Sequence, residues 1–183
     1  MIFFRRLMAL SFSMGIMFGI NACQTSSQHN PPGSPKGHPA LKKLNKIQYQ
    51  VTQKGATEKA FKNKFWDHYE PGIYVDIVSG DPLFSSLDKF DSKSGYPGFK
   101  APISHNAVKL IDESYMLFMS RTELRSRKSN AHLGHLFMDG PGRDKKHYCV
   151  NSASLKFIPV SDLEKSGYGK YKILFSKENT IKK

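Results

Sequence analysis

The chain reads GIYVDIVSGDPLF over residues 72–84, and this stretch contains the clearest strand signal in the sequence. Its first half places Ile73, Val75 and Ile77 at alternate positions, so their side chains would share one face of an extended strand. The turn-forming SGDP sequence ends that strand, and the Leu-Phe pair after it begins another. Two strands joined by a short turn indicate antiparallel pairing.

Further strands are expected downstream, and helix is scarce. Residues 122–127 alternate charged with other side chains. Residues 147–159 form the longest candidate strand, in which one face would carry Cys149, Asn151, Ala153, Leu155 and Phe157. Residues 57–68 can hold one short helix, and residues 161–164 have the spacing of a capping box for another that Gly167 would end. We therefore expect a mainly β domain of antiparallel strands with short helices at its rim.

The N-terminal residues have the pattern of an export signal. Arg5 and Arg6 precede an apolar run over residues 7–20, which is too short to span a bilayer and has the length of a signal-peptide core. The run ends in Ile-Asn-Ala-Cys at residues 20–23, which resembles the lipobox of bacterial lipoproteins. Cleavage there would remove residues 1–22 and leave Cys23 as a lipidated first residue. The alternative is an ordinary cleaved signal with a chance cysteine.

Composition predicts a tether, one domain and a tail after the signal. Residues 23–54 are rich in proline, glutamine, serine and lysine and poor in apolar side chains, so we expect a flexible tether. Residues 55–176 are globular in composition and long enough for a single core. Residues 177–183 form a basic tail.

The chain is strongly basic, with a formal net charge of +13. Signal removal would take away two arginines and no acid, which leaves +11. The lysines are scattered along the chain without one basic stripe, which argues against nucleic-acid binding. Solvated surface charge explains the excess most simply, and a basic face toward anionic lipid or cell-wall polymer would also suit an exported protein.

Cys149 is the candidate nucleophile, because it is the only thiol left once Cys23 is acylated. An unpaired thiol is unusual in an oxidising compartment, although many free cysteines are simply small core residues. Strand alternation places His147 and Asn151 on the face of Cys149, where an imidazole would lower the pKa of the thiol and an amide could hold a water or a substrate oxygen.

A second group of polar residues lies upstream in HLGHLFMD, residues 132–139. His132, His135 and Asp139 could supply protons or orient one another. Together with Cys149 they also offer enough ligands for zinc, but a regular strand would send the two histidines to opposite faces, and no Cys-x-x-Cys pair is present. Spacing alone leaves thiol chemistry, a metal site and a structural cluster open.

Several sequence blocks resemble the B-type peptide-methionine (R)-S-oxide reductases, in that family's order. They read GIYVDIVSGDPLFSS (72–86), KFDS (89–92), RTELRS (121–126), HLGHLF (132–137), YCVNSASLKFIP (148–159) and GYGKY (167–171). The resemblance covers roughly residues 55–176 and implies a fold of two antiparallel β-sheets.

The resemblance also implies a mechanism for the site. Cys149 would attack the sulfur of a methionine sulfoxide, release methionine and become a sulfenic acid. His135 would be the main proton donor, His132 would tune the thiolate, and Asp139 and Asn151 would hold water and substrate. The two histidines could face one pocket if a turn or bulge interrupts the strand near Gly134. No cofactor is implied.

The substrate-binding residues depart from the family pattern. Tyr96 stands where the family has a tryptophan that packs on the substrate methyl group, and His147 replaces an arginine, so thiolate formation would depend on pH. Phe137 would complete the substrate-binding group. Ser94 occupies the position of a resolving cysteine in many members, and serine cannot form that disulfide. Because the zinc-binding cysteine pairs of other members are missing, we predict no structural metal.

These features predict an oxidative-stress repair enzyme for oxidised proteins in the bacterial cell envelope. An external thiol, small or thioredoxin-like, would recycle the sulfenic acid. Gln24 is not the aspartate that retains some lipoproteins in the inner membrane, so we expect a periplasm-facing anchor in the outer membrane. The alternative is a degenerate domain of the same fold that binds oxidised methionine or cell-wall material without turnover, which Tyr96 and His147 would explain.

Overall fold

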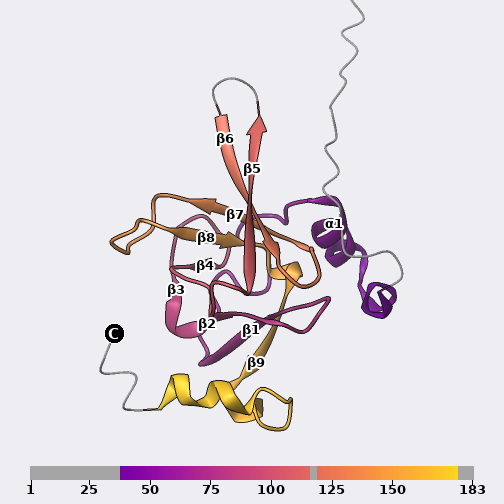
Figure 1. Cartoon of the computed structure of the whole chain (residues 1–183), viewed down its shortest axis with the longest axis vertical. Helices are drawn as coiled ribbons and strands as arrows, with labels where there is room; N and C mark the ends of the chain where they lie inside the picture. Colours follow the sequence, from indigo (N-terminus) through magenta and orange to yellow (C-terminus); the bar gives the residue numbers. More distant parts are fainter. Residues whose placement is uncertain (1–37, 116–118, 177–183) are drawn as a thin grey trace, which may run out of the picture.

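The computed structural model describes residues 38–115 and 119–176. The strands of these residues form two antiparallel sheets (Figure 1). The predicted signal peptide, Cys23 and the basic tail lie outside these described residues. The elements in chain order are η1 (Pro39–Lys43), α1 (Lys46–Lys54), β1 (Gly72–Asp76), β2 (Pro82–Ser85), η2 (Ser86–Asp88), β3 (Lys89–Phe90), β4 (Gly98–Phe99), β5 (Val108–Tyr115), β6 (Met119–Ser126), β7 (His132–Phe137), β8 (His147–Val150), η3 (Ser152–Ser154), β9 (Leu155–Pro159), η4 (Val160–Asp162) and η5 (Gly169–Phe175).

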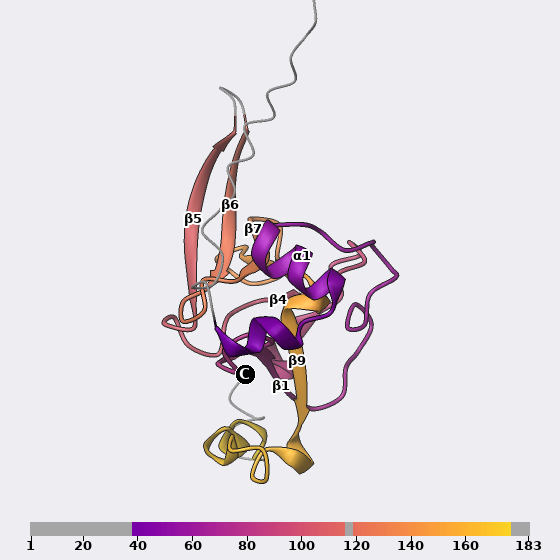
Figure 2. The same cartoon turned by 90° about the vertical axis from the view of Figure 1, so that its right-hand side faces the viewer.

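The smaller sheet has the order β2-β1-β9 and the larger has the order β3-β4-β8-β7-β6-β5. All the strand pairs are antiparallel. The hairpin of β5 and β6 extends well beyond the body of the domain, and the C-terminal segment lies at the opposite end (Figures 1 and 2). The predicted fold class, mainly β with two antiparallel sheets and short peripheral helices, is confirmed.

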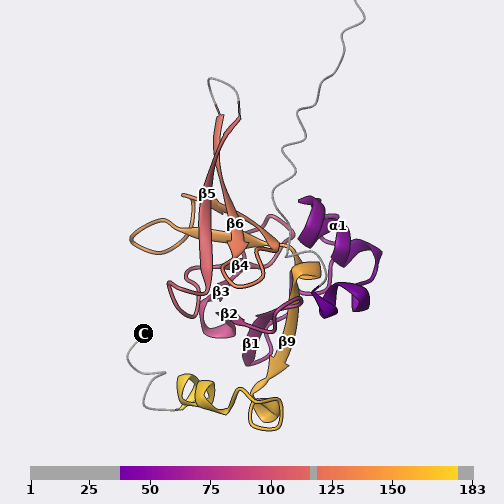
Figure 3. The same ribbon diagram turned by 45° about the vertical axis from the view of Figure 1, so that its right-hand side comes forward.

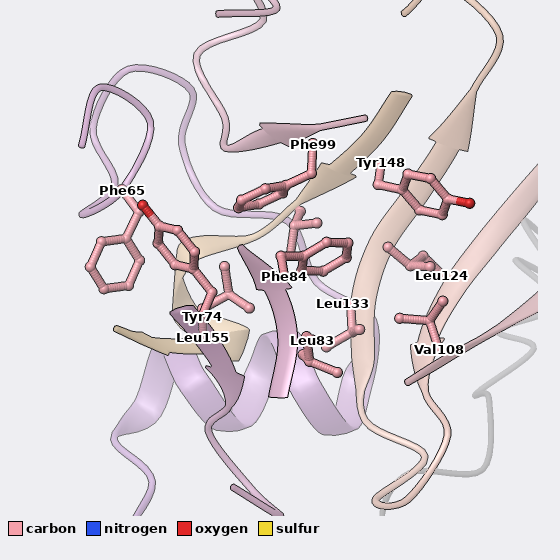
Figure 4. Packing of buried hydrophobic residues seen from close by; sticks show 11 residues of the cluster. Phe65, Tyr74, Leu83, Phe84, Phe99, Val108, Leu124, Leu133, Tyr148 and Leu155 are labelled. Carbon is pink, nitrogen blue, oxygen red and sulfur yellow. The ribbon is translucent and has the colours of Figure 1, made fainter. Parts of the chain in front are cut away.

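The space between the two sheets is filled by aromatic and aliphatic side chains (Figure 4). Phe84 from β2 and Phe99 from β4 stack with ring centroids 4.5 Å apart, and Tyr74 from β1 meets Phe99 edge-on at 5.1 Å. Tyr148 and Val150 reach this core from β8. Each large apolar side chain buried here stabilises the fold by about 1.5–3 kcal/mol, so the core fixes which face of β8 points inward.

A second apolar cluster covers the outer face of the smaller sheet. Ile73 and Val75 from β1 and Ile158 from β9 pack there against Leu163 and the residues that follow it. The predicted α-helix after residue 161 is wrong, since the chain instead forms the 3-10 helices η4 and η5 with a turn between them. Gly167 adopts a positive φ of 83° in that turn, which explains the glycine.

The first strand signals are confirmed, but the long strand predicted over residues 147–159 is wrong. The three residues of η3 divide it into β8 in the larger sheet and β9 in the smaller one. The sequence of residues 147–159 fits an alternating strand pattern throughout, so the pattern does not reveal so short a 3-10 turn.

Residues 38–54 are not the expected flexible tether. Helix α1 begins with a capping box between Asn45 and Gln48 and ends at Gly55, which is left-handed with φ 67°. Its Val51 is fully buried, and the helix packs against β7 and η3 (Figure 3). The folded domain thus begins before residue 55, whereas residues 57–68, expected to be helical, form turns.

None of the helices in the described ranges has both the length and the apolar character needed to cross a membrane.

Candidate active site

Cys149 lies in the middle of the larger sheet, on the face that points away from the core. Residues alternate along β8, so Tyr148 and Val150 enter the core while His147 and Cys149 point to the other side. Cys149 is directly opposite Gly98 on β4 and His135 on β7. The thiol is half-buried. This register brings the predicted nucleophile and the predicted proton donor onto neighbouring strands.

A β-bulge turns both histidines of the HLGH segment to the same face. Leu124 on β6 pairs with Gly134, but the next residue, Arg125, pairs with His132, so one residue of β7 is extra. The rings of His132 and His135 meet edge-on with centroids 5.4 Å apart. The predicted interruption near Gly134 is therefore confirmed.

Gly134 itself is required by the close approach of β8. A Cβ at this position would lie 2.0 Å from the backbone oxygen of Cys149, well inside van der Waals contact. Only a glycine lets β7 and β8 pair next to the thiol.

The pKa of the Cys149 thiol is raised above its ordinary value. Burial is the main cause, and the negative charge of Asp139 adds to it, while a hydrogen bond from the Ser94 side chain acts in the opposite direction. The sequence had led us to expect that the histidines would lower this pKa. Removal of the thiol from water instead dominates the shift, and no histidine is among its causes, so the resting group is a protonated thiol.

Ser94 and Tyr96 form the wall beside the thiol, in the loop between β3 and β4. The Ser94 hydroxyl is bonded to that of Ser92 at 2.7 Å as well as to the thiol. Tyr96 donates its hydroxyl to the backbone oxygen of Glu58 at 2.8 Å. Burial, together with the nearby charge of Cys149, raises the pKa of Tyr96. Tyr96 therefore offers the site its ring, while its hydroxyl is held by the segment that follows α1.

His147 and Asp139 form a pair at the other side of the thiol. His147 Nδ1 lies 2.9 Å from the Asp139 carboxylate, which is itself largely exposed. The buried Nε2 atom of His147 has no hydrogen-bond partner among the described residues. It points toward Gly98, where a Cβ would be only 3.1 Å from it. The aromatic rings of Phe90 and Phe137 lie 5.0 and 5.8 Å from the imidazole, so the half-exposed Phe137 belongs to this edge of the site.

Asn151 does not share the face of Cys149, because β8 ends at Val150. Its side chain is buried: Nδ2 donates to Leu133 O at 3.1 Å, and Oδ1 accepts from the Glu58 N–H at 3.0 Å. Both of these hydrogen bonds are made to backbone groups, one on the bulged residue of β7 and one in the segment after α1. Neither is made to the thiol.

Two residues of the site were missed by the sequence reasoning. Glu123 and Arg125 on β6 are almost completely buried beside His132. Their only signal was the alternation of charged residues in the RTELRS segment, which predicts a shared strand face but does not predict that the face is covered.

In the described ranges, no three His, Cys, Asp or Glu side chains converge in a way that could hold a metal ion. Of the candidate zinc ligands, His132 is bonded to Glu123 through Nδ1, and Asp139 is bonded to His147.

Comparison with known proteins agrees with this arrangement. The model of the SelR domain family matches residues 44–159, which include α1 and every strand. A peptide methionine sulfoxide reductase MsrA/MsrB of Vibrio cholerae serotype O1 is 51% identical over 133 residues. The match covers 73% of this chain and 35% of the relative, so the chain spans about a third of that protein's length. The chain belongs to the SelR domain family, the B-type peptide methionine sulfoxide reductases.

Proposed function

We propose that this protein reduces methionine-R-sulfoxide in oxidised proteins to methionine, with Cys149 as the nucleophile. The observation that carries the proposal is the placement of one half-buried thiol directly opposite His135 on the neighbouring strand, with His132 beside it. A thiol next to imidazoles on a rigid sheet has both a nucleophile and a route for the proton. The family and the similar MsrA/MsrB relative support the same chemistry.

The reaction starts from the protonated thiol of Cys149. His135 takes the proton from Cys149, and the thiolate attacks the sulfoxide sulfur. His135 then returns the proton to the sulfoxide oxygen as the sulfur–oxygen bond breaks. The attack forms a bond between the Cys149 sulfur and the sulfur of the substrate. The hydroxide released from the sulfoxide then attacks the Cys149 sulfur, the sulfur–sulfur bond breaks with its electron pair going to methionine, and Cys149 is left as a sulfenic acid. Tyr96 and Phe137 supply apolar faces for the substrate's methyl group and neighbouring chain.

Recycling needs two external thiols. The first condenses with the sulfenic acid, releasing water and leaving a mixed disulfide on Cys149, and the second displaces the protein thiol. Ser94 lies against the thiol but cannot act as a resolving residue. The reductant is therefore a thioredoxin-like protein or a small thiol.

Turnover of the two sulfoxide epimers tests the activity. With excess dithiothreitol, the protein should convert a peptide containing methionine-R-sulfoxide and leave the S epimer unchanged, and Cys149→Ser should abolish the conversion. A binding domain of the same fold, which the replacements Tyr96 and His147 would favour, would retain the sulfoxide peptide and release no methionine.

We also propose that Cys23 carries a lipid that anchors the protein to the envelope, facing the periplasm and in the outer membrane. The support is the sequence alone: the basic start, the apolar run and the Ile-Asn-Ala-Cys motif. Labelling with a fatty-acid analogue should mark the wild-type chain and not Cys23→Ser. Equal labelling of both chains would exclude this anchor.

A further inference from the structure

A buried ion pair lies behind the two histidines. Arg125 Nε donates to Glu123 Oε2 at 2.7 Å, and His132 Nδ1 is 2.6 Å from Glu123 Oε1. The side chains of all three residues are at most 3% exposed. The guanidinium also donates to the backbone oxygen of Asn130 at 2.8 Å. Both carboxylate oxygens are thus held from opposite sides, and the carboxylate has little freedom to move.

The carboxyl group of Glu123 is ionised. Burial by itself would raise the pKa of Glu123, but the hydrogen bonds from His132 and Arg125 and the charge of Arg125 outweigh burial, and the net pKa is lowered. An ionised carboxylate accepts hydrogen bonds and cannot donate one. His132 must therefore carry its proton on Nδ1, because that atom is the one in contact with Glu123.

The other ring nitrogen of His132, Nε2, is left to be accounted for. In a neutral imidazole with Nδ1 protonated, Nε2 is bare. This atom is buried and has no hydrogen-bond partner among the described residues. Buried polar atoms are nearly always paired, so an unpaired one in an active site indicates a group that completes its bonding with a substrate or a water.

The charged and titratable groups around His132 come from three strands. Glu123 and Arg125 face it from β6, His135 adjoins it on β7, and Cys149 lies opposite His135 on β8. Among the residues that the structure describes, Glu123 alone contacts this imidazole through a carboxylate, so its removal should act on His132 first.

We infer that Glu123, fixed by Arg125, is a positioning residue that holds His132 as its Nδ1–H tautomer and keeps the Nε2 lone pair available as a hydrogen-bond acceptor. The acceptor receives the hydroxyl that forms on the transferred oxygen, and proton delivery to the sulfoxide remains with His135. This assignment rests on the proposed reductase function for its catalytic meaning, whereas the tautomer itself does not depend on turnover.

Nitrogen-15 NMR of the histidine rings tests the tautomer in the wild-type protein near pH 7. The signals of His132 are assigned by their loss in His132→Gln. We expect His132 Nδ1 to be protonated and Nε2 to be bare, and we expect Glu123→Gln to shift the population toward the Nε2–H form. A wild-type His132 in the Nε2–H form, or doubly protonated, would overturn the inference even if the enzyme is fully active.

Kinetics test the catalytic consequence. Glu123→Gln should lower kcat for the R-sulfoxide peptide by about 10- to 100-fold, the range seen when the partner that orients a functional histidine is removed. KM should change little, and Glu123→Asp, which keeps the charge, should recover part of the rate. The matched control is Glu164→Gln, which removes an exposed carboxylate paired with Lys172 and should leave kcat unchanged.

A second variant guards against misfolding, since Glu123→Gln leaves the charge of Arg125 buried. Glu123→Gln combined with Arg125→Met removes both charges at similar volume, a change that buried ion pairs often tolerate. The double variant should fold and show the same loss of kcat and the same altered His132 signal. A folded double variant with wild-type kcat would refute the positioning role. If the wild-type protein itself shows no turnover, the proposed reductase function fails, and the NMR result still decides the tautomer.

Discussion

At the level of single residues, the reactivity of Cys149 depends on opposing influences. Burial and Asp139 raise the pKa of the thiol, and the Ser94 hydroxyl lowers it. The structure places His135 opposite Cys149 and the Ser94 hydroxyl in hydrogen-bond contact with the thiol, with Tyr96 near it. The sequence did not predict the direction of the pKa shift of Cys149, because the extent of burial follows from the packing of β4 and β7 on either side of β8.

The raised pKa predicts a specific pH dependence for alkylation of Cys149 by iodoacetamide. Only the thiolate reacts, so below the pKa the rate should rise by about tenfold for each pH unit. Because the folded-state pKa is raised, this rise should continue above the pH at which a free cysteine, with a pKa of about 8.5, levels off. The rate is measured by quenching the alkylation at set times and quantifying the product by mass spectrometry, with N-acetylcysteine as the reference. A plateau for Cys149 below the pH of the reference would contradict the expected direction.

The contact between Ser94 and the thiol predicts the effect of Ser94→Cys. The introduced thiol should attack the sulfenic acid, expel water and form a disulfide with Cys149 after one turnover. Most of the protein should then carry a peptide cross-link between the two positions by mass spectrometry. Ser161→Cys, at an exposed serine in η4 on the rim of the domain, is the matched control and should give no such cross-link. Persistence of free sulfenic acid in Ser94→Cys would show that position 94 lies too far from the reacting sulfur.

At the level of secondary-structure elements, the site depends on the pairing of β7 with β8. Gly134 permits this pairing, because any Cβ would collide with the backbone oxygen of Cys149. Gly134→Ala should therefore lower the free energy of unfolding by on the order of 3 kcal/mol and reduce turnover. Gly142→Ala is the control, since a Cβ there meets its nearest atom, in the Asp144 side chain, at 3.4 Å. Equal stability of the two variants in urea denaturation would show that the strands can separate without penalty.

Helix α1 is the element whose contribution differs most from the sequence expectation. Val51 is fully buried, so Val51→Ala should destabilise the domain by about 2 kcal/mol through the lost methyl groups and the cavity left behind. Tyr49→Ala, on the exposed side of the same helix, should cost much less. Thermal or urea unfolding distinguishes the two. Similar small changes for both variants would mean that α1 adds little to the stability of the fold.

The successes and failures of the sequence reasoning have physical causes at this level. Strands β1 and β2 were predictable because their alternation ends at a run of turn formers. Helix α1 was missed because its composition is polar and only its caps, Asn45 with Gln48 and Gly55, mark it as a helix. The break between β8 and β9 was missed because the sequence there still fits an alternating strand pattern, although residues 152–154 form a 3-10 turn. In each case a local signal was present, but tertiary packing determined which secondary structure formed.

At the level of the whole molecule, two sheets enclose one core and the chemistry lies on the outer face of the larger sheet. This arrangement lets β4, β6, β7 and β8 each contribute residues to one surface while their other faces secure the fold. The fold class and the identity of the thiol followed from the sequence and its family resemblance. The burial of Glu123 and Arg125 did not, because a charged residue on a strand is usually solvated, and here the bulge in β7 brings His132 to Glu123.

A single-turnover measurement examines the proposed chemistry most directly. Protein carrying Cys23→Ser, with Cys149 as its one thiol, is mixed with excess methionine-R-sulfoxide peptide and dimedone in the absence of reductant. We predict one methionine released per protein chain and a dimedone adduct on Cys149. Continued methionine release without reductant, or methionine release with no oxidation of Cys149, would contradict reduction of the sulfoxide by this thiol.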